Sequence, residues 1–150
     1  MAQQQDLFDG QGRIPCPARI RRLSDFAFGW IDARLQRDGW FGVMSTKEIA
    51  AYAFLCLVAN RSGLSWYRRE RIAQQLGLPR DEVDQALQRL LDLDLVAFRP
   101  FYARSRDGFY QVLSLPQGGP AGVSLAVEQA IAQGGTVQST VPDHGKGDNL

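Results

Sequence analysis

The sequence predicts an α+β domain, mainly α, in which a three-helix core is followed by a two-stranded β-hairpin. Apolar residues recur at helical spacing in three successive stretches between residues 46 and 93. Two short strand-like runs follow, and an Asp107-Gly108 pair marks the turn between them. The chain has 150 residues, of which 45% are apolar and 22% charged, and this composition suits one globular domain.

Residue composition divides the chain into three parts. Residues 1–24 carry four arginines and two acids, and we expect a flexible basic arm. Residues 25–115 carry nearly all the aromatic and branched apolar residues and therefore hold the core. Residues 116–150 contain seven glycines and are expected to be mostly disordered. A short helix at 125–133, capped by Ser124, is the one element expected there.

A strand and a capped helix are expected at the start of the core. Phe26, Phe28 and Trp30 alternate with small residues, which indicates a short strand. Residues 31–40 suggest a turn or short helix. Ser45 and Glu48 then stand at the spacing of a capping box, and the helix that they begin covers residues 46–59.

Two further helices and the hairpin complete the core. The second helix is expected at 67–76, with Gly77 as its left-handed stop. Pro79 restarts the chain, and acidic residues occupy the first turns of a third helix at 80–93. The strands are expected at 95–98 and 109–115.

The residues IAQQLGLPRDEVDQALQRLLDLDLVAF resemble the winged helix-turn-helix family, over about residues 40–115. The resemblance implies that Gly77 is the turn glycine and that Leu78 is the apolar plug between the helices. It also implies that residues 80–93 form the recognition helix. Asp94 stands where the family often has glycine, but aspartate tolerates the left-handed conformation, so the turn survives.

The segment before the motif adds a narrower likeness. The pattern F-x-F-x-W-I-D-x-x-L, with Tyr52 in the helix that follows, is similar to lead-ins of bacterial plasmid replication initiators and small mobile-element proteins.

The exposed face of the third helix holds the candidate base-reading residues. Gln85 and Gln88 suit bidentate contacts with adenine, and Arg89 suits guanine or phosphate. Asp81 and Asp92 share this face and would repel phosphates, and a merely solvated helix face is the alternative interpretation.

Phosphate contacts are expected at helix starts and on the hairpin. The candidates at the helix starts are Tyr67, Arg68, Arg71 and Arg80. On the hairpin tip they are Arg104 and Arg106, which would otherwise be solubilising residues. In the arm they are Arg19, Arg21 and Arg22, which would lie in a minor groove or belong to a plain linker.

The aromatic residues near these sites are expected to have structural roles. We expect Trp66 to be a core or edge residue, the alternative being a base-stacking platform, and Phe101 and Tyr102 to brace the hairpin against the core.

Catalytic and metal chemistry is not expected. The lone histidine, His144, lies in the glycine-rich tail, and neither Cys16 nor Cys56 has a second ligand at metal-site spacing. No phosphate-binding glycine motif is present. We therefore expect a protein that is not an enzyme and has no cofactor and no metal.

The net charge is only +1, although all but two of the 17 basic residues are arginines. Arginine suits phosphate and guanine contacts, but a G+C-rich coding bias would produce the same excess. No apolar run approaches the ~20 residues of a membrane span, and the first residues do not resemble a secretory signal. These features suggest a cytoplasmic protein.

Two functions compete. The first is a double-stranded DNA-binding protein, either a small transcriptional regulator or an accessory factor in replication or transposition on a bacterial mobile element. The alternative is a winged-helix protein-interaction module without a DNA role, which the low net charge favours. Further expected partners are a second copy of the chain and a protein bound by the C-terminal tail, but no membrane.

Overall fold

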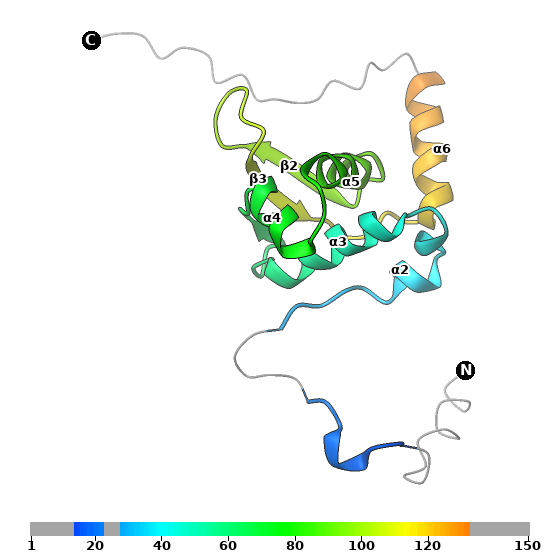
Figure 1. Cartoon of the computed structure of the whole chain (residues 1–150). Coiled ribbons are helices and arrows are strands. Elements are labelled where there is room, and N and C mark those ends of the chain that lie inside the picture. Colours follow the sequence, from blue (N-terminus) through cyan, green and yellow to red (C-terminus); the bar gives the residue numbers. More distant parts are fainter. Residues whose placement is uncertain (1–13, 23–27, 133–150) are drawn as a thin grey trace.

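The computed structural model describes residues 14–22 and 28–132, and Figure 1 shows the arrangement of their elements. The element order is η2 (Pro17–Arg19), α2 (Arg34–Arg37), η3 (Trp40–Gly42), α3 (Thr46–Val58), β1 (Leu64–Ser65), α4 (Arg69–Leu76), α5 (Arg80–Asp92), β2 (Val96–Pro100), β3 (Gly108–Val112) and α6 (Gly119–Ala132). From α3 to β3 this is the winged helix-turn-helix fold, mainly helical with a small antiparallel sheet. The expected fold class is confirmed.

Helix α3 begins with the expected capping box. The Glu48 backbone N–H donates to Ser45 Oγ at 3.2 Å, and the Ser45 backbone N–H donates to Glu48 Oε2 at 3.1 Å. The helix ends at Val58. The Asn60 side chain then accepts hydrogen bonds from the backbone N–H groups of Ser62 and Leu64, which turns the chain into β1.

The turn between α4 and α5 follows from Gly77, which has φ of +64°. Glycine adopts the left-handed conformation that ends a helix with little steric strain, because it lacks a Cβ. The Leu78 backbone N–H donates to the Ala73 carbonyl, and Pro79 restarts the chain into α5. The start of α4 differs from the expectation, because Arg68 is extended and the helix begins at Arg69 rather than at residue 67.

The sheet has one strand more than the predicted hairpin. Its order is β1-β3-β2, and both pairings are antiparallel. A strand of two residues is too short to show alternation, so the sequence pattern could not indicate β1. Asp94 precedes β2 with φ of +58°, which confirms that the turn tolerates aspartate there.

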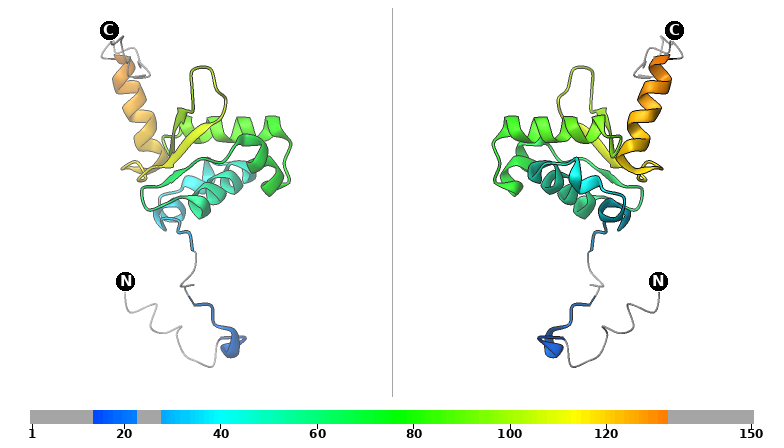
Figure 2. Two further views of the ribbon diagram at one scale, coloured as in Figure 1. Left: turned by 90° about the vertical axis from the view of Figure 1, so that its left-hand side faces the viewer. Right: turned by 90° about the vertical axis from the view of Figure 1, so that its right-hand side faces the viewer.

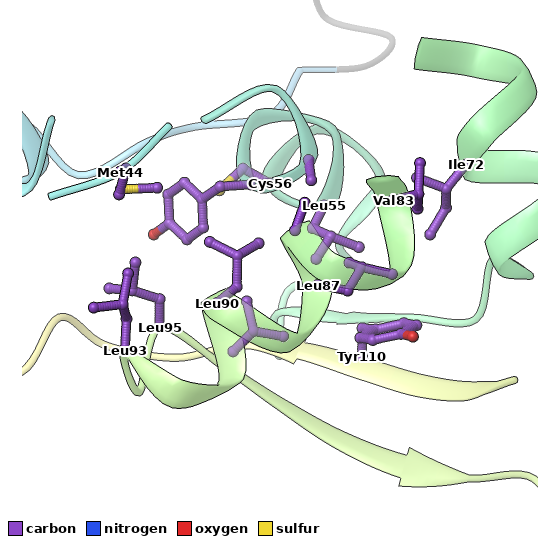
Figure 3. Packing of buried hydrophobic residues seen from close by; sticks show 14 of the residues in the cluster. Met44, Leu55, Cys56, Ile72, Val83, Leu87, Leu90, Leu93, Leu95 and Tyr110 are labelled. Atoms are coloured by element: carbon purple, nitrogen blue, oxygen red, sulfur yellow. The ribbon is translucent and has the colours of Figure 1, made fainter. Parts of the chain in front are cut away.

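The core lies between α3, α4, α5 and the sheet. Figure 3 shows apolar side chains from these elements facing one another, with Leu55 of α3, Leu87 and Leu90 of α5 and Tyr110 of β3 among them. Trp40 of η3 and Leu35 of α2 are also fully or almost fully buried, so the segment before α3 closes the end of this core.

The expected strand at residues 26–30 is wrong for the residues that the structure describes. Residues 28–32 have no regular structure, and residues 26 and 27 lie outside the described residues. A Cβ at Gly29 would stand 2.6 Å from Leu57 Cα, so this segment lies directly against α3. It packs on a helix instead of pairing with a strand, and Phe28 and Trp30 are exposed.

Helix α6 starts earlier than expected. It begins at Gly119 and not after Ser124. Gly118 and Gly119 both have positive φ and turn the chain, and Pro120 then fits the first helical turn. Gly119 is buried beside Asp38, and the partly buried Val123 packs against the core. Residue 133, the expected end of the helix, lies outside the described residues. None of the helices among the described residues is long and apolar enough to span a membrane.

Candidate nucleic-acid interface

A shallow hollow lies between α5 and the loop that joins β2 to β3. It has a volume of about 550 Å³, and we call it the helix–wing hollow. Its lining comprises Arg69, Asp84, Gln85, Gln88, Arg89, Asp92 and Arg106. Four of the candidate DNA-binding residues, Gln85, Gln88, Arg89 and Arg106, therefore lie together although α5 and the wing are distant in sequence.

Two of these residues are engaged with acidic neighbours. Gln88 Nε2 donates to Asp92 Oδ1 at 3.0 Å, one helical turn further along α5. Arg89 Nε lies 3.6 Å from Glu48 Oε1 of α3. Asp92 uses one N–H of the Gln88 amide, so the second N–H and the amide oxygen remain for other partners. Asp81, which was expected on the same face, does not line the hollow.

The wing loop, residues 101–107, is closed by its own hydrogen bonds. The Phe101 backbone N–H donates to the Asp107 carbonyl at 3.1 Å, and Ser105 Oγ donates to the same carbonyl at 2.7 Å. Arg104 has φ of +66°. Arg104 and Arg106 are both exposed, and only Arg106 lines the helix–wing hollow.

The expected bracing of the wing is only partly present. Phe101 packs edge-on against Phe109, with ring centroids 5.0 Å apart. Tyr102, in contrast, is 72% exposed, so its expected bracing role is wrong. It lies two residues beyond the end of β2, in the loop before β3, which projects from the body (Figure 2).

A second hollow, of about 500 Å³, surrounds the start of α4, and we call it the α4 hollow. Its lining comprises Val58, Ser65, Trp66, Tyr67, Arg68 and Arg71. It brings together three candidate phosphate-binding residues, Tyr67, Arg68 and Arg71. Tyr67 is fixed by an edge-on contact with Phe54, with ring centroids 5.3 Å apart.

Trp66 is a residue of this hollow that the sequence interpretation did not select. Its side chain is 59% exposed, so it is not a core residue, and it directly follows β1 at the edge of the sheet. It follows the buried Ser65 in the extended chain after β1, and successive side chains there face opposite sides. The only sequence signal that Trp66 belongs to this hollow was its position next to Tyr67 and Arg68.

The remaining candidate residues lie apart from both hollows. Arg80 is exposed at the first residue of α5, beside Glu70 and the turn after α4. The arm residues Arg19, Arg21 and Arg22 are exposed in and after η2.

Arg69 is not among the candidate residues, yet its guanidinium joins α4 to β3 and α5. Its Nε donates to the Tyr110 hydroxyl at 2.9 Å, and its Nη1 donates to Asp84 Oδ1 at 3.1 Å. Burial disfavours the charge, but the contacts with Tyr110 and Asp84 outweigh burial and raise the pKa of Arg69. Burial also raises the pKa of Tyr110, against the effect of Arg69. At neutral pH the pair is a cation bonded to a neutral phenol.

No protein-family model matches the chain, and no curated protein matches it. Several solved structures are similar to it, including the following three. A MarR family regulator from Neisseria meningitidis has a TM-score of 0.38 and 17% identity over 66% of this chain, which spans 65% of that protein. A mutant of Lactococcus lactis ZitR in apo form has a TM-score of 0.34 and 17% identity, covering 70% of this chain and 78% of that one. A ZitR mutant in complex with DNA has a TM-score of 0.36 and 15% identity, covering 91% and 86%. At such scores these likenesses assign neither a family nor a function.

Proposed function

We propose that this chain binds double-stranded DNA, with α5 in the major groove and the wing on the adjacent backbone. The observation that carries the proposal is the helix–wing hollow, where Gln85 and Gln88 of α5 face the same space as Arg106 of the wing. Amide side chains that read base edges and an arginine that meets phosphate are the two kinds of group that such binding needs side by side.

Each candidate residue has a distinct task in this proposal. Gln85 and Gln88 read bases, and Arg89 reaches guanine or phosphate once it leaves Glu48. The residues that hold the backbone are Tyr67, Arg68, Arg71, Arg80, Arg104 and Arg106. The arm residues Arg19, Arg21 and Arg22 extend the contact into a neighbouring minor groove.

The biological role that fits is regulation of transcription by occupation of a site, without catalysis. Replication and transposition on a mobile element would use the same occupation of DNA. The position of the bound sites separates these roles, because a regulator binds at promoters and an accessory factor binds at origins or element ends.

We also propose that the domain acts as a homodimer, with residues 25–115 as its DNA-binding unit and α6 as the dimer contact, and that the part of the C-terminal tail beyond α6 holds a protein partner. Helix α6 carries one charged residue, Glu128, in 14 residues and projects from the body (Figure 2). A helix with so few charged residues is normally partly covered, and a second copy would cover it. Two copies also double the number of phosphate contacts.

The test is DNA binding as a function of salt, measured by fluorescence anisotropy on mixed-sequence duplexes and on duplexes selected from a random pool. If Arg68, Arg71, Arg80, Arg104 and Arg106 each neutralise a phosphate, log K falls against log salt with a slope of about −4.5 for each protomer bound. Replacement of Arg104 and Arg106 by alanine should weaken binding to all sequences alike and reduce the slope by about 1.8.

The matched control replaces Arg34 and Arg37 by alanine. These arginines lie on α2, outside both hollows, and their loss changes the net charge equally. Binding that is absent at high micromolar protein, or that does not depend on salt, would reject the proposal in favour of a protein-interaction module.

A further inference from the structure

The wing loop is fastened to the first turn of α4. The Arg69 backbone N–H, which would otherwise be an unpaired donor at the start of the helix, donates to Asp107 Oδ1 at 2.9 Å. Arg68, at the N-cap position, makes no capping hydrogen bond with its side chain. A carboxylate 38 residues further along the chain therefore caps α4.

The side chain of Arg69 adds a second attachment at the same place. It is only 16% exposed, it donates to the Tyr110 hydroxyl in β3, and it pairs with Asp84 of α5. The guanidinium also lies 5.7 Å from the centre of the Phe98 ring in β2. One residue thus contacts the recognition helix and both wing strands, while its backbone holds the loop.

These attachments do not make the hairpin, because the pairing of β2 with β3 runs from Val96–Val112 to Pro100–Gly108 without them. They fix where the loop beyond that pairing lies. Arg106 immediately precedes Asp107, so the backbone that Asp107 anchors is the backbone that carries Arg106.

We propose that Arg69, Asp107 and Tyr110 form a wing latch, which positions Arg106 opposite Gln85 and Gln88 for DNA binding. The proposal rests on the proposed function. The latch residues are positioning residues, since their polar groups are directed to one another and to Asp84. A loop already held in place loses less conformational freedom on binding, so a latched Arg106 contributes more to affinity than an unlatched one.

Two substitutions of Asp107 separate the hydrogen bond from the charge. Asp107→Asn removes the negative charge but keeps a side-chain oxygen that caps a helix about as well as aspartate. Asp107→Ala removes both. Both variants lose the negative charge, so both gain the same affinity from weaker repulsion of phosphate. A difference in DNA affinity between them therefore measures the effect of the capping hydrogen bond.

The experiment measures the cost of Arg106→Ala in three backgrounds, on a duplex selected by the unmodified chain. With the latch intact, and in Asp107→Asn, the substitution should weaken binding about tenfold, the size of one charge-assisted contact. In Asp107→Ala the cost should fall to about twofold or less. An equal cost in all three backgrounds would overturn the proposal, because Arg106 would then not depend on the latch.

A second measurement needs no DNA. The Nε–H of Arg69, bonded to the Tyr110 hydroxyl, should give an NMR signal protected from exchange with water, and Tyr110→Phe should remove that protection. Rapid exchange in the unmodified chain would overturn the latch itself. If the protection is present but the unmodified chain binds no DNA, the proposed function fails and the positioning role fails with it.

Discussion

Glu48→Gln is expected to tighten DNA binding, although Glu48 faces no DNA in the proposed complex. Its two carboxylate oxygens have different partners: Oε2 accepts the Ser45 backbone N–H, and Oε1 lies 3.6 Å from Arg89 Nε. Glutamine also completes a capping box, so the helix start is retained. The substitution therefore releases Arg89 while it leaves α3 in place.

The size of the effect follows from the exposure of the pair. The Arg89 side chain is 48% exposed, and an ion pair at such a site is worth up to about 1 kcal/mol. Arg89 must give up this pair to reach guanine or phosphate. Glu48→Gln removes the free-energy cost of breaking the Arg89–Glu48 pair, so the Kd of this variant for DNA should be about twofold to fivefold lower.

The assay is anisotropy on the selected duplex over a series of salt concentrations, with urea unfolding alongside. Asp32→Asn is the matched control, because it removes the same charge and breaks the Arg34–Asp32 pair in the segment before α2. The unfolding free energy of Glu48→Gln should stay within about 1 kcal/mol of the unmodified chain. If Glu48→Gln binds no more tightly than Asp32→Asn, Arg89 does not reach DNA, and the reasoning is refuted.

Three further predictions concern the interface, the thiols and the wing. Gln85→Ala should relax base preference at one position of the selected site; an unchanged consensus would show that Gln85 does not read bases. Burial raises the pKa of Cys56 from 9.0 to about 11, so a thiol reagent at pH 8 should modify the exposed Cys16 and spare Cys56 until the chain unfolds. Since the folded-state pKa of Cys56 is the higher one, the free energy of unfolding should fall as pH rises from about 9 to about 11, and Cys56→Ala should remove that part of the fall. Gly108→Ala should destabilise the wing by about 1–3 kcal/mol in urea unfolding, because a Cβ there would overlap the Arg99 carbonyl and lie 2.7 Å from Pro100 Cα; an unchanged midpoint would contradict this.

The parts of the fold that could be predicted from sequence are those whose signals are local. Ser45 and Glu48 lie three residues apart, and Gly77 lies one residue beyond the helix that it ends, so neighbouring residues suffice to mark both positions. The alternation at Phe28 and Trp30 was misleading. The segment that holds them lies against α3 without pairing to a strand, and its exposed aromatic residues recur with the same two-residue period as the side chains of a strand. Strand β1 was missed because only its pairing with β3 defines it.

The candidate site shows the same limit. The faces of α5 could be assigned from helical periodicity, and Gln85 and Gln88 are exposed as that periodicity predicts. The capping of α4 by Asp107 could not be predicted, because no local pattern joins residues 38 positions apart. The partners of the Arg69 guanidinium, Tyr110 and Asp84, could not be predicted for the same reason, because they lie 41 and 15 positions away.

The net charge of +1 does not show which charged residues are already paired within the fold. Several basic residues near α5 already have acidic partners: Arg89 pairs with Glu48, Lys47 with Glu82, and Arg69 with Asp84. Within the described part of the chain, Arg68, Arg71, Arg104 and Arg106 form no ion pair and are exposed. Because Asp107 joins the wing loop to the first turn of α4, these four arginines belong to neighbouring segments of one side of the domain. The ion-paired acids Glu48, Glu82 and Asp84 thus hold the fold, and the four arginines are free to meet a phosphate backbone in the proposed complex.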